Sequence, residues 1–377
     1  MCTIRAGCPN PAHPPRPTRD LFSSGYACAI GGTGLPSGKG KERANAGFDL
    51  DLYWHPCIVR PMKSALAFAG LAMLMTTLVS RSAEPVSLTE RLGYRPGDRL
   101  LIVNGDDAGM CHAANEATIE SLEKGLMTSA SIMAPCPWFY EIAQYAKAHP
   151  DKDFGLHLCH TSEWKVYRWG PVAPREQVPG LVDPTGCLWP EIEQVYAHAN
   201  PDQAFVEARA QVRKALDAGI DVTHLDSHMG TLQYDARYME AYLKLAREFD
   251  LPVRMASQAT LEKFHQPELR SKFSAQGIIF TDYFIFDELP QESRDVKGFW
   301  LKIVAGLQPG VTELYIHAAK PTEELQTITG SWRTRSAEFE VFAHDADMRK
   351  LMETEHITRI GYRPLRDLQR TSRKAGR

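Results

Sequence analysis

The stretch RLLIVNGDDAG, residues 99–109, decides how the rest of the chain is interpreted. It follows the turn-forming residues Pro96, Gly97 and Asp98, and its apolar part, residues 100–103, is hydrophobic enough to be buried on both faces. Strands of this kind are typical of parallel sheets, whose two faces are covered by helices. We therefore expect residues 99–104 to form a buried parallel strand that ends in two adjacent aspartates.

The same pattern of short apolar runs alternating with amphipathic helices continues downstream, and it predicts a parallel α/β domain over residues 90–370. Further strands are expected at residues 128–133, 154–158, 222–225, 253–255, 278–286 and 313–316. Helices are expected at residues 114–126, 201–218, 235–249 and 296–307. Residues 160–200, rich in Trp, Pro and Gly, are expected to form a long excursion over one end of the barrel.

Composition excludes several classes of protein. The chain has 377 residues, 44% of them hydrophobic, which is ample for a buried core. Its formal net charge of -3 indicates no basic surface, so binding to nucleic acid is not expected. Its eight cysteines are too few and too scattered for a disulfide framework.

The N-terminal segment has a different composition. Residues 1–61 are rich in Gly, Pro, Arg and Ser and lack a periodic apolar pattern, so we expect them not to fold. Met62 and Lys63 then precede an apolar run and a small-residue exit, the layout of a signal peptide over residues 62–83. We expect residues 1–61 to be a misassigned upstream extension, and the mature protein to be secreted or periplasmic, without stable membrane association. A membrane anchor with a disordered cytoplasmic tail is the alternative.

Polar side chains with metal-binding chemistry stand at the ends of four predicted strands. In a parallel barrel these ends converge on one mouth. Two imidazoles and one carboxylate form an open divalent-metal site, and where two aspartates are adjacent, one can bind the metal while its neighbour stays free to act as a general base. The residues concerned are Asp106, Asp107, His157, His228 and His317.

Each residue also has a structural interpretation. Adjacent aspartates often form a hydrogen-bonded turn, and a histidine in an apolar strand is often a core residue. The spacing of His224 and His228 matches a zinc motif that belongs on a helix, whereas here it follows a strand. Trp164, Trp169 and Trp189 suit either stacking on sugar rings or packing of the excursion onto the barrel. The coincidence of four strand ends favours a functional site.

Five motifs in order, NGDDAG, LMTSASIM, GLHL, THLDSH and TELYIH, resemble those of the YdjC-type carbohydrate deacetylases, which include ChbG and HpnK. The resemblance covers residues 100–368. It implies a distorted, incomplete (β/α) TIM-like barrel akin to that of polysaccharide deacetylases. It also implies hydrolysis of N-acetyl groups on amino sugars with the help of one divalent metal ion, Mg or Zn.

The resemblance assigns roles residue by residue. Asp106 corresponds to the proton acceptor, His317 to a general acid, and Arg254 to an arginine that could orient Asp106. The family's metal ligands fall on Asp107, His157 and His228. The chain departs from the family pattern around Ala108, after His228 and after His317, and these positions bear on the identity of the substrate.

The sequence thus predicts a metal-dependent hydrolase acting on an N-acetylated sugar or oligosaccharide, with Asp106 as base. A homodimer is compatible with the sequence. A secreted carbohydrate-binding protein on an inactive deacetylase scaffold, and a hydrolase of another ester or amide, are the alternatives. An open site of two histidines and one carboxylate also suits non-haem iron oxygenases and phosphoester hydrolases, but the alternating pattern is not the double-stranded β fold of the oxygenases.

Overall fold

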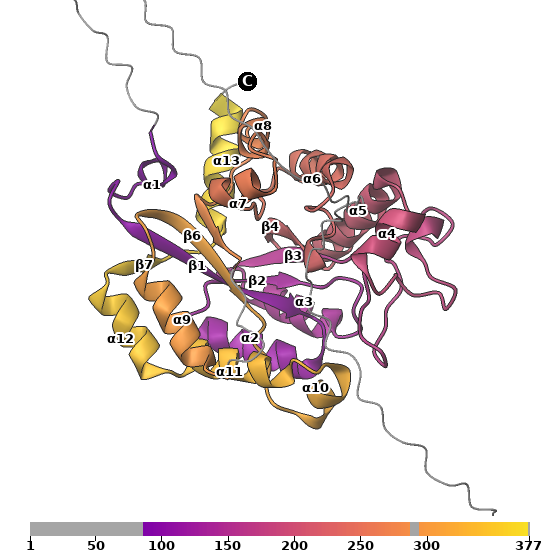
Figure 1. The fold of residues 1–377 in the computed structure, drawn as a ribbon, viewed down its shortest axis with the longest axis horizontal. Helices are drawn as coiled ribbons and strands as arrows, with labels where there is room; N and C mark the ends of the chain where they lie inside the picture. Colours follow the sequence, from indigo (N-terminus) through magenta and orange to yellow (C-terminus); the bar gives the residue numbers. More distant parts are fainter. Residues whose placement is uncertain (1–85, 287–293, 376–377) are drawn as a thin grey trace, which may run out of the picture. The chain divides into compact units, whose positions relative to one another are not determined.

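The computed structural model describes residues 86–286 and 294–375 (Figure 1). The predictions for residues 1–61 and 62–83 lie outside the described residues. Across the described ranges, every helix is too short or too polar to cross a membrane.

The described chain forms one parallel sheet in which β4, β3, β2, β1, β6 and β5 lie in that order, and β7 pairs with the start of β1 (Figure 1). The strands are β1 (Arg99–Ala108), β2 (Ser129–Ile132), β3 (Phe154–Leu158), β4 (Val222–Ser227), β5 (Tyr283–Ile285), β6 (Gly310–Ile316) and β7 (Ile357–Arg359). This arrangement confirms the predicted α/β class.

The sheet curves toward closure without a regular strand between β4 and β5. Val253 forms a single parallel bridge with Leu225 of β4, and its backbone N–H donates to Ile279 O at 3.2 Å. The predicted strand at 253–255 is therefore reduced to one bridge, and only residues 283–285 of the predicted strand 278–286 are extended and paired. The result is the distorted, incomplete barrel.

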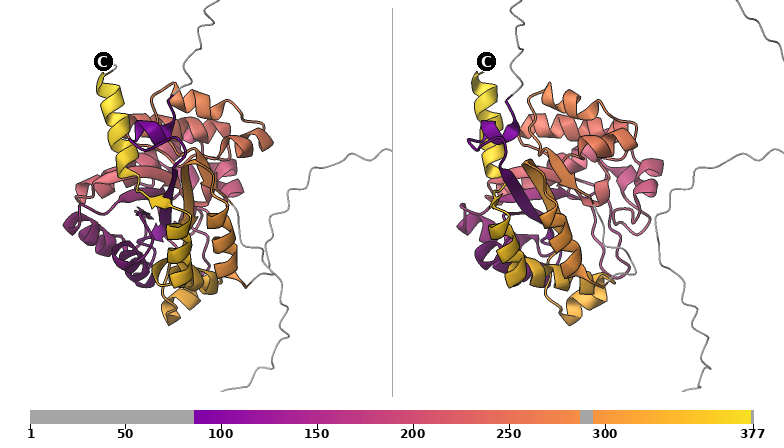
Figure 2. Two further views of the ribbon diagram at one scale, coloured as in Figure 1. Left: turned by 90° about the vertical axis from the view of Figure 1, so that its left-hand side faces the viewer. Right: turned by 60° about the vertical axis from the view of Figure 1, so that its left-hand side comes forward.

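Helices flank the sheet on both sides in the views of Figures 1 and 2. The predicted helices are confirmed as α2 (His112–Lys124), α5 (Pro201–Asp217), α6 (Ala236–Phe249) and α9 (Val296–Ala305). The other helices are α1 (Leu88–Arg91), α3 (Phe139–Ala148), α4 (Ile192–His198), α7 (Gln258–Lys263), α8 (Leu269–Ser274), α10 (Glu323–Ile328), α11 (Trp332–Ala343), α12 (Ala346–Thr354) and α13 (Arg363–Ala375).

Helix α5 shows how local sequence sets a boundary. The Asn200 side chain accepts a hydrogen bond from Gln203 N at 3.0 Å, and Pro201 occupies the first helical position. A side-chain cap accepts a hydrogen bond from one of the free N–H groups at the start of a helix, and a proline at the first position has no N–H to leave unpaired. Gly219, with φ +89°, follows its C-terminal end, where the left-handed region favours glycine.

The two faces of β1 pack against different parts of the molecule. Leu101 and Val103 belong to the large core that includes the helix layer, whereas Leu100 and Ile102 pack in a smaller cluster with residues of β6 and the C-terminal segment. Because side chains alternate along a strand, Asn104 and Asp106 share the face of Leu100 and Ile102. This face is thus apolar at the start of β1 and polar at its end, where the site lies.

Gly155 of β3 provides a test of this packing. A Cβ atom there would lie 2.4 Å from Cε1 of His224, whose ring stacks on Tyr362 with centroids 3.9 Å apart. We expect Gly155→Ala to lower the free energy of unfolding by about 1–3 kcal/mol, as overpacking of a core does. The control is Gly330→Ala, where the added Cβ has nothing within 4 Å. Urea unfolding measures both, and equal midpoints would contradict the prediction.

Candidate active site

Asp106 and Asp107 lie in an irregularity of β1. Gly105 pairs with Ala130 and Ala108 with Ile132, so β1 has one residue more than β2 over this interval. Asp107 takes up the extra residue with φ +66°, a left-handed conformation that aspartate adopts more readily than most residues. Two consecutive side chains, which would normally diverge, therefore both approach the same imidazole.

That imidazole belongs to His157 of β3. Its Nδ1 is 3.9 Å from Asp106 Oδ2, and its Nε2 is 3.3 Å from Asp107 Oδ1. His228, the first residue after β4, places its Nδ1 3.6 Å from the same Asp107 oxygen and 3.2 Å from His157 Nε2. One ligand atom from each of the three residues thus lies within 4.8 Å of the others, and all three residues are buried.

The donor set fits a divalent cation. Both oxygens of Asp107 are buried without a well-formed hydrogen bond among the described residues, although Arg335 Nη2 lies 2.8 Å from Oδ2. Two imidazole nitrogens and one carboxylate oxygen are ligands that suit Zn²⁺ and related metals and leave coordination positions open. The structure therefore brings Asp107, His157 and His228 together as the sequence predicted.

In each imidazole, the ring nitrogen that faces away from Asp107 lies within hydrogen-bond distance of a second carboxylate. His157 Nδ1 is 2.6 Å from Oδ1 of Asp226, its register partner on β4, and His228 Nε2 is 3.0 Å from Oε2 of Glu163. Burial lowers the pKa of His157, but Asp226 and Asp106 more than reverse this effect and raise it. Burial acts on His228 in the same way, and Glu163 and Asp107 raise its pKa to about 10.

Arg254 binds both oxygens of the Asp106 carboxylate. Its Nη1 and Nη2 donate to Asp106 Oδ2 and Oδ1 at 2.7 and 2.8 Å, and its Nε donates to Glu313 Oε1 at 2.8 Å. Asn104 adds a hydrogen bond to Asp106 Oδ1 at 2.8 Å. Burial alone would raise the pKa of Asp106, but the charges of Arg254 and His157 outweigh it and hold the pKa below its usual range. Asp106 is therefore ionised at neutral pH.

His317 follows β6 at the same end of the barrel. Its backbone N–H donates to Glu338 Oε2 at 2.8 Å, and its ring is sensitive to the charges of Arg335, Asp107 and Asp106. Burial and the charge of Arg335 lower the pKa of His317 to about 4. Its imidazole is therefore neutral at pH 7.

The chain is similar to proteins of a known family. The model of the YdjC-like protein family matches residues 100–353. The chain belongs to this family. It is 28% identical over 264 residues to a carbohydrate deacetylase of Thermoanaerobacter pseudethanolicus, which covers 70% of this chain and 98% of the relative. It is 32% identical over 278 residues to a carbohydrate deacetylase of Thermus thermophilus, which covers 72% of this chain and 97% of the relative.

A solved structure shares the fold. The crystal structure of an Enterococcus faecalis protein named for cellobiose-phosphate cleavage matches with a TM-score of 0.62 and 25% sequence identity. The match covers 71% of this chain and 99% of that protein.

Sequence reasoning missed Arg335 in this YdjC-like chain. Its guanidinium, from α11, reaches Asp107 Oδ2 and lies 5.7 Å from the Trp164 ring centroid. Arg335 is on a helix far along the chain from Asp107 and follows no strand, so the strand-end rule could not find it. Asp226 belongs to the motif THLDSH, but its contact with His157 depends on the pairing register of β3 and β4, which the sequence does not reveal.

The tryptophans of the excursion are packing residues in this YdjC-like fold. Trp164 and Trp169 are buried, with ring centroids 5.3 Å apart and 6.4 and 6.2 Å from that of His228. Trp189 donates through Nε1 to Gly180 O at 2.8 Å and stacks on His198. Trp164 and Trp169 therefore pack beside the imidazole of the metal-ligand candidate His228.

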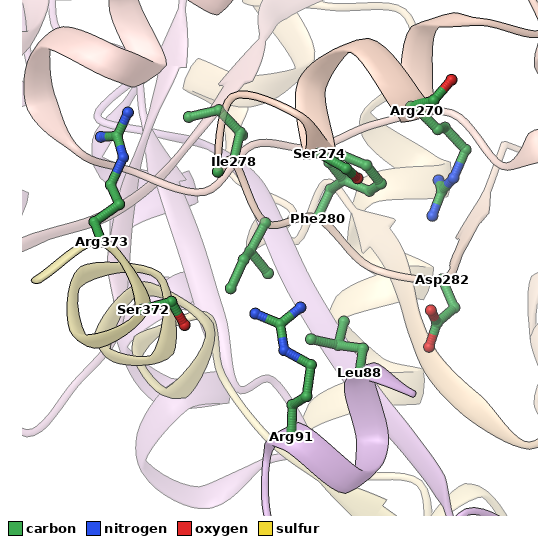
Figure 3. A pocket seen from close by; sticks show the side chains of 12 residues that line it. Leu88, Arg91, Arg270, Ser274, Ile278, Phe280, Asp282, Ser372 and Arg373 are labelled. Carbon is green, nitrogen blue, oxygen red and sulfur yellow. The ribbon is translucent and has the colours of Figure 1, made fainter. Parts of the chain in front are cut away.

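A cavity of about 430 Å³ lies elsewhere. Leu88 and Arg91 of α1, which precedes β1, line it together with Phe280 and Asp282, which precede β5 (Figure 3). Residues that precede parallel strands are at the opposite end of the barrel from residues that follow them. This cavity is therefore separate from the candidate active site.

Arg254 offers a test of the buried charges. Arg254→Ala removes the cation that pairs with Asp106, Asp226 and Glu313. Because an uncompensated buried charge is costly, we expect the free energy of unfolding to fall by about 3–5 kcal/mol. The control is Arg237→Ala, which removes an exposed ion pair and should cause no measurable change. Chemical denaturation followed by circular dichroism measures both, and similar losses in the two variants would contradict the prediction.

Proposed function

We propose that this chain is a metal-dependent carbohydrate deacetylase that hydrolyses the N-acetyl amide of an amino sugar or oligosaccharide. The observation that carries the proposal is the convergence of ligand atoms from Asp107, His157 and His228 beside an ionised Asp106. The relatives from Thermoanaerobacter pseudethanolicus and Thermus thermophilus align with this chain over nearly their whole length, and both are named carbohydrate deacetylase. Their names support the same activity for this chain.

The proposed cofactor is one divalent metal ion, Mg or Zn. The two imidazole donors favour Zn²⁺ over Mg²⁺, because Mg²⁺ prefers an all-oxygen octahedral environment. When bound, such an ion supplies Lewis acidity and lowers the pKa of a coordinated water. The ligands of the proposed site are Asp107, His157 and His228.

In this proposal Asp106 removes the proton from the attacking water. Arg254 keeps the Asp106 carboxylate ionised and fixes its orientation through two hydrogen bonds. Oδ1 also accepts from Asn104, whereas Oδ2 accepts only from Arg254 among the described residues and retains a further lone pair for the proton. A base that is held in place within the site and already ionised needs no reorganisation before it accepts the proton.

His317 is the proposed proton donor to the leaving nitrogen. Since its pKa is lowered to about 4, the ring is neutral at pH 7 and must first receive a proton within the site. Once protonated, an imidazolium of low pKa is a strong acid, and this property suits the protonation of an amide nitrogen that otherwise leaves poorly. We propose that His317 is protonated by the proton that Asp106 takes from the attacking water.

The test separates metal binding from chemistry. Asp106→Asn should retain the metal and lose turnover by about 10²–10⁴-fold, because the proton acceptor is removed while the three proposed ligands stay in place. His157→Ala and His228→Ala should lose both metal and activity, because each removes a ligand. Metal analysis after reconstitution with Zn²⁺, and acetate release from a panel of N-acetylated sugars, are the measurements.

His344→Ala is the matched control, since this half-exposed histidine follows α11 and contacts none of the proposed ligands. It should bind metal and release acetate as the unaltered chain does. Equal metal content and equal acetate release across all four variants would refute the proposal. Sugar binding without acetate release by the metal-loaded chain would favour a carbohydrate-binding protein.

A further inference from the structure

The two imidazoles of the proposed metal site present opposite nitrogens to it. His157 faces Asp107 with Nε2, whereas His228 faces the same oxygen with Nδ1. A histidine ligates through one nitrogen only if that nitrogen is unprotonated, and the group bonded to the other nitrogen determines this. Each ring therefore needs an acceptor on its far side.

The acceptors come from different parts of the fold. Asp226 is the acceptor for His157. It is fully buried on β4 and lies 3.3 Å from Arg254 Nη2, so it is part of the barrel itself. Glu163 serves His228 and belongs to the excursion that follows β3. Its side chain is 20% exposed, which leaves it at the border of the buried site.

The excursion is fixed to the barrel on both sides of Glu163. Before it, Cys159 N donates to Gln211 Oε1 at 2.9 Å, and Gln211 Nε2 donates back to Cys159 O at 2.6 Å. After it, Glu207 accepts hydrogen bonds from the backbone of Val172 and Ala173, both at 2.9 Å. Gln211 and Glu207 lie on α5, so this helix determines where the Glu163 carboxylate is presented.

We propose that Glu163 is a positioning residue that holds His228 with Nδ1 free to bind the cation, so that the excursion completes a metal site otherwise built from the barrel. This inference rests on the proposed function, because it takes Asp107, His157 and His228 as the ligands. Carboxylates in this position fix the tautomer and orientation of a ligating histidine and increase its basicity.

The experiment measures Zn²⁺ alone binding to the full chain, by competition with a chromophoric chelator. Glu163→Ala should weaken Zn²⁺ binding by about 10–100-fold, the range found when such a carboxylate is lost. Glu163→Gln should restore part of this loss, because an amide oxygen accepts the same hydrogen bond without the charge. Glu176→Ala, an exposed glutamate of the same excursion, is the matched control and should leave the affinity unchanged.

A second readout distinguishes positioning from folding. The ¹⁵N chemical shifts of the His228 ring should show a single protonated nitrogen, Nε2, in the zinc-loaded chain, and a mixture of tautomers in metal-free Glu163→Ala at a pH where the ring is neutral. The melting temperature of metal-free Glu163→Ala should match that of the unaltered chain. Unchanged zinc affinity in Glu163→Ala, or a single Nε2-protonated tautomer without the carboxylate, would overturn the inference.

These outcomes separate the inference from the proposed function. If the unaltered chain binds Zn²⁺, Glu163→Ala weakens that binding, and no N-acetylated sugar is hydrolysed, the deacetylase proposal fails while the role of Glu163 is supported. If His228→Ala leaves zinc affinity unchanged, His228 is not a ligand, and the inference fails with the site.

Discussion

Arg254 lies among three buried carboxylates, and the geometry of the site depends on how its single charge is shared. Its guanidinium contacts Asp106, Asp226 and Glu313 within 3.3 Å, so buried negative charge exceeds the positive charge that faces it. Such a cluster is stable only if further hydrogen bonds or protons compensate. Tyr362 donates to Glu313, and burial raises the pKa of Glu313 to about 7, which reduces the charge to be balanced.

The Arg254 cluster leads directly to the proposed metal site. Asp226 joins Arg254 to His157 Nδ1, which leaves Nε2 directed at Asp107. Asp106, held by the same guanidinium, is thereby kept ionised beside the proposed ligands. The proposed base and the proposed ligand carboxylate, adjacent in sequence, have separate partners: Arg254 for Asp106 and the two imidazoles for Asp107. This separation is what the two proposed roles require.

The barrel supports this polar cluster with an apolar layer. On β1, Leu100 and Ile102 share a face with Asn104 and Asp106, so one strand passes from the hydrophobic part of the interior to the end where the candidate active site lies. His224 and Tyr362 fill the space next to Gly155, where no larger side chain fits. The polar groups thus rest on a close-packed base that limits their movement.

The sequence by itself determined the parallel α/β class, four of the long helices, and the residues that converge at the strand ends, because apolar periodicity and the geometry of parallel strands are local properties. It overestimated the strands at 253–255 and 278–286 and missed β7, since short strands depend on their partners. Only the tertiary structure decided that a bulge at Asp107 turns both aspartates to one side, and that Arg335 and Glu163 reach the site. Those contacts join segments far apart in the chain, where no periodic pattern connects one partner to the other.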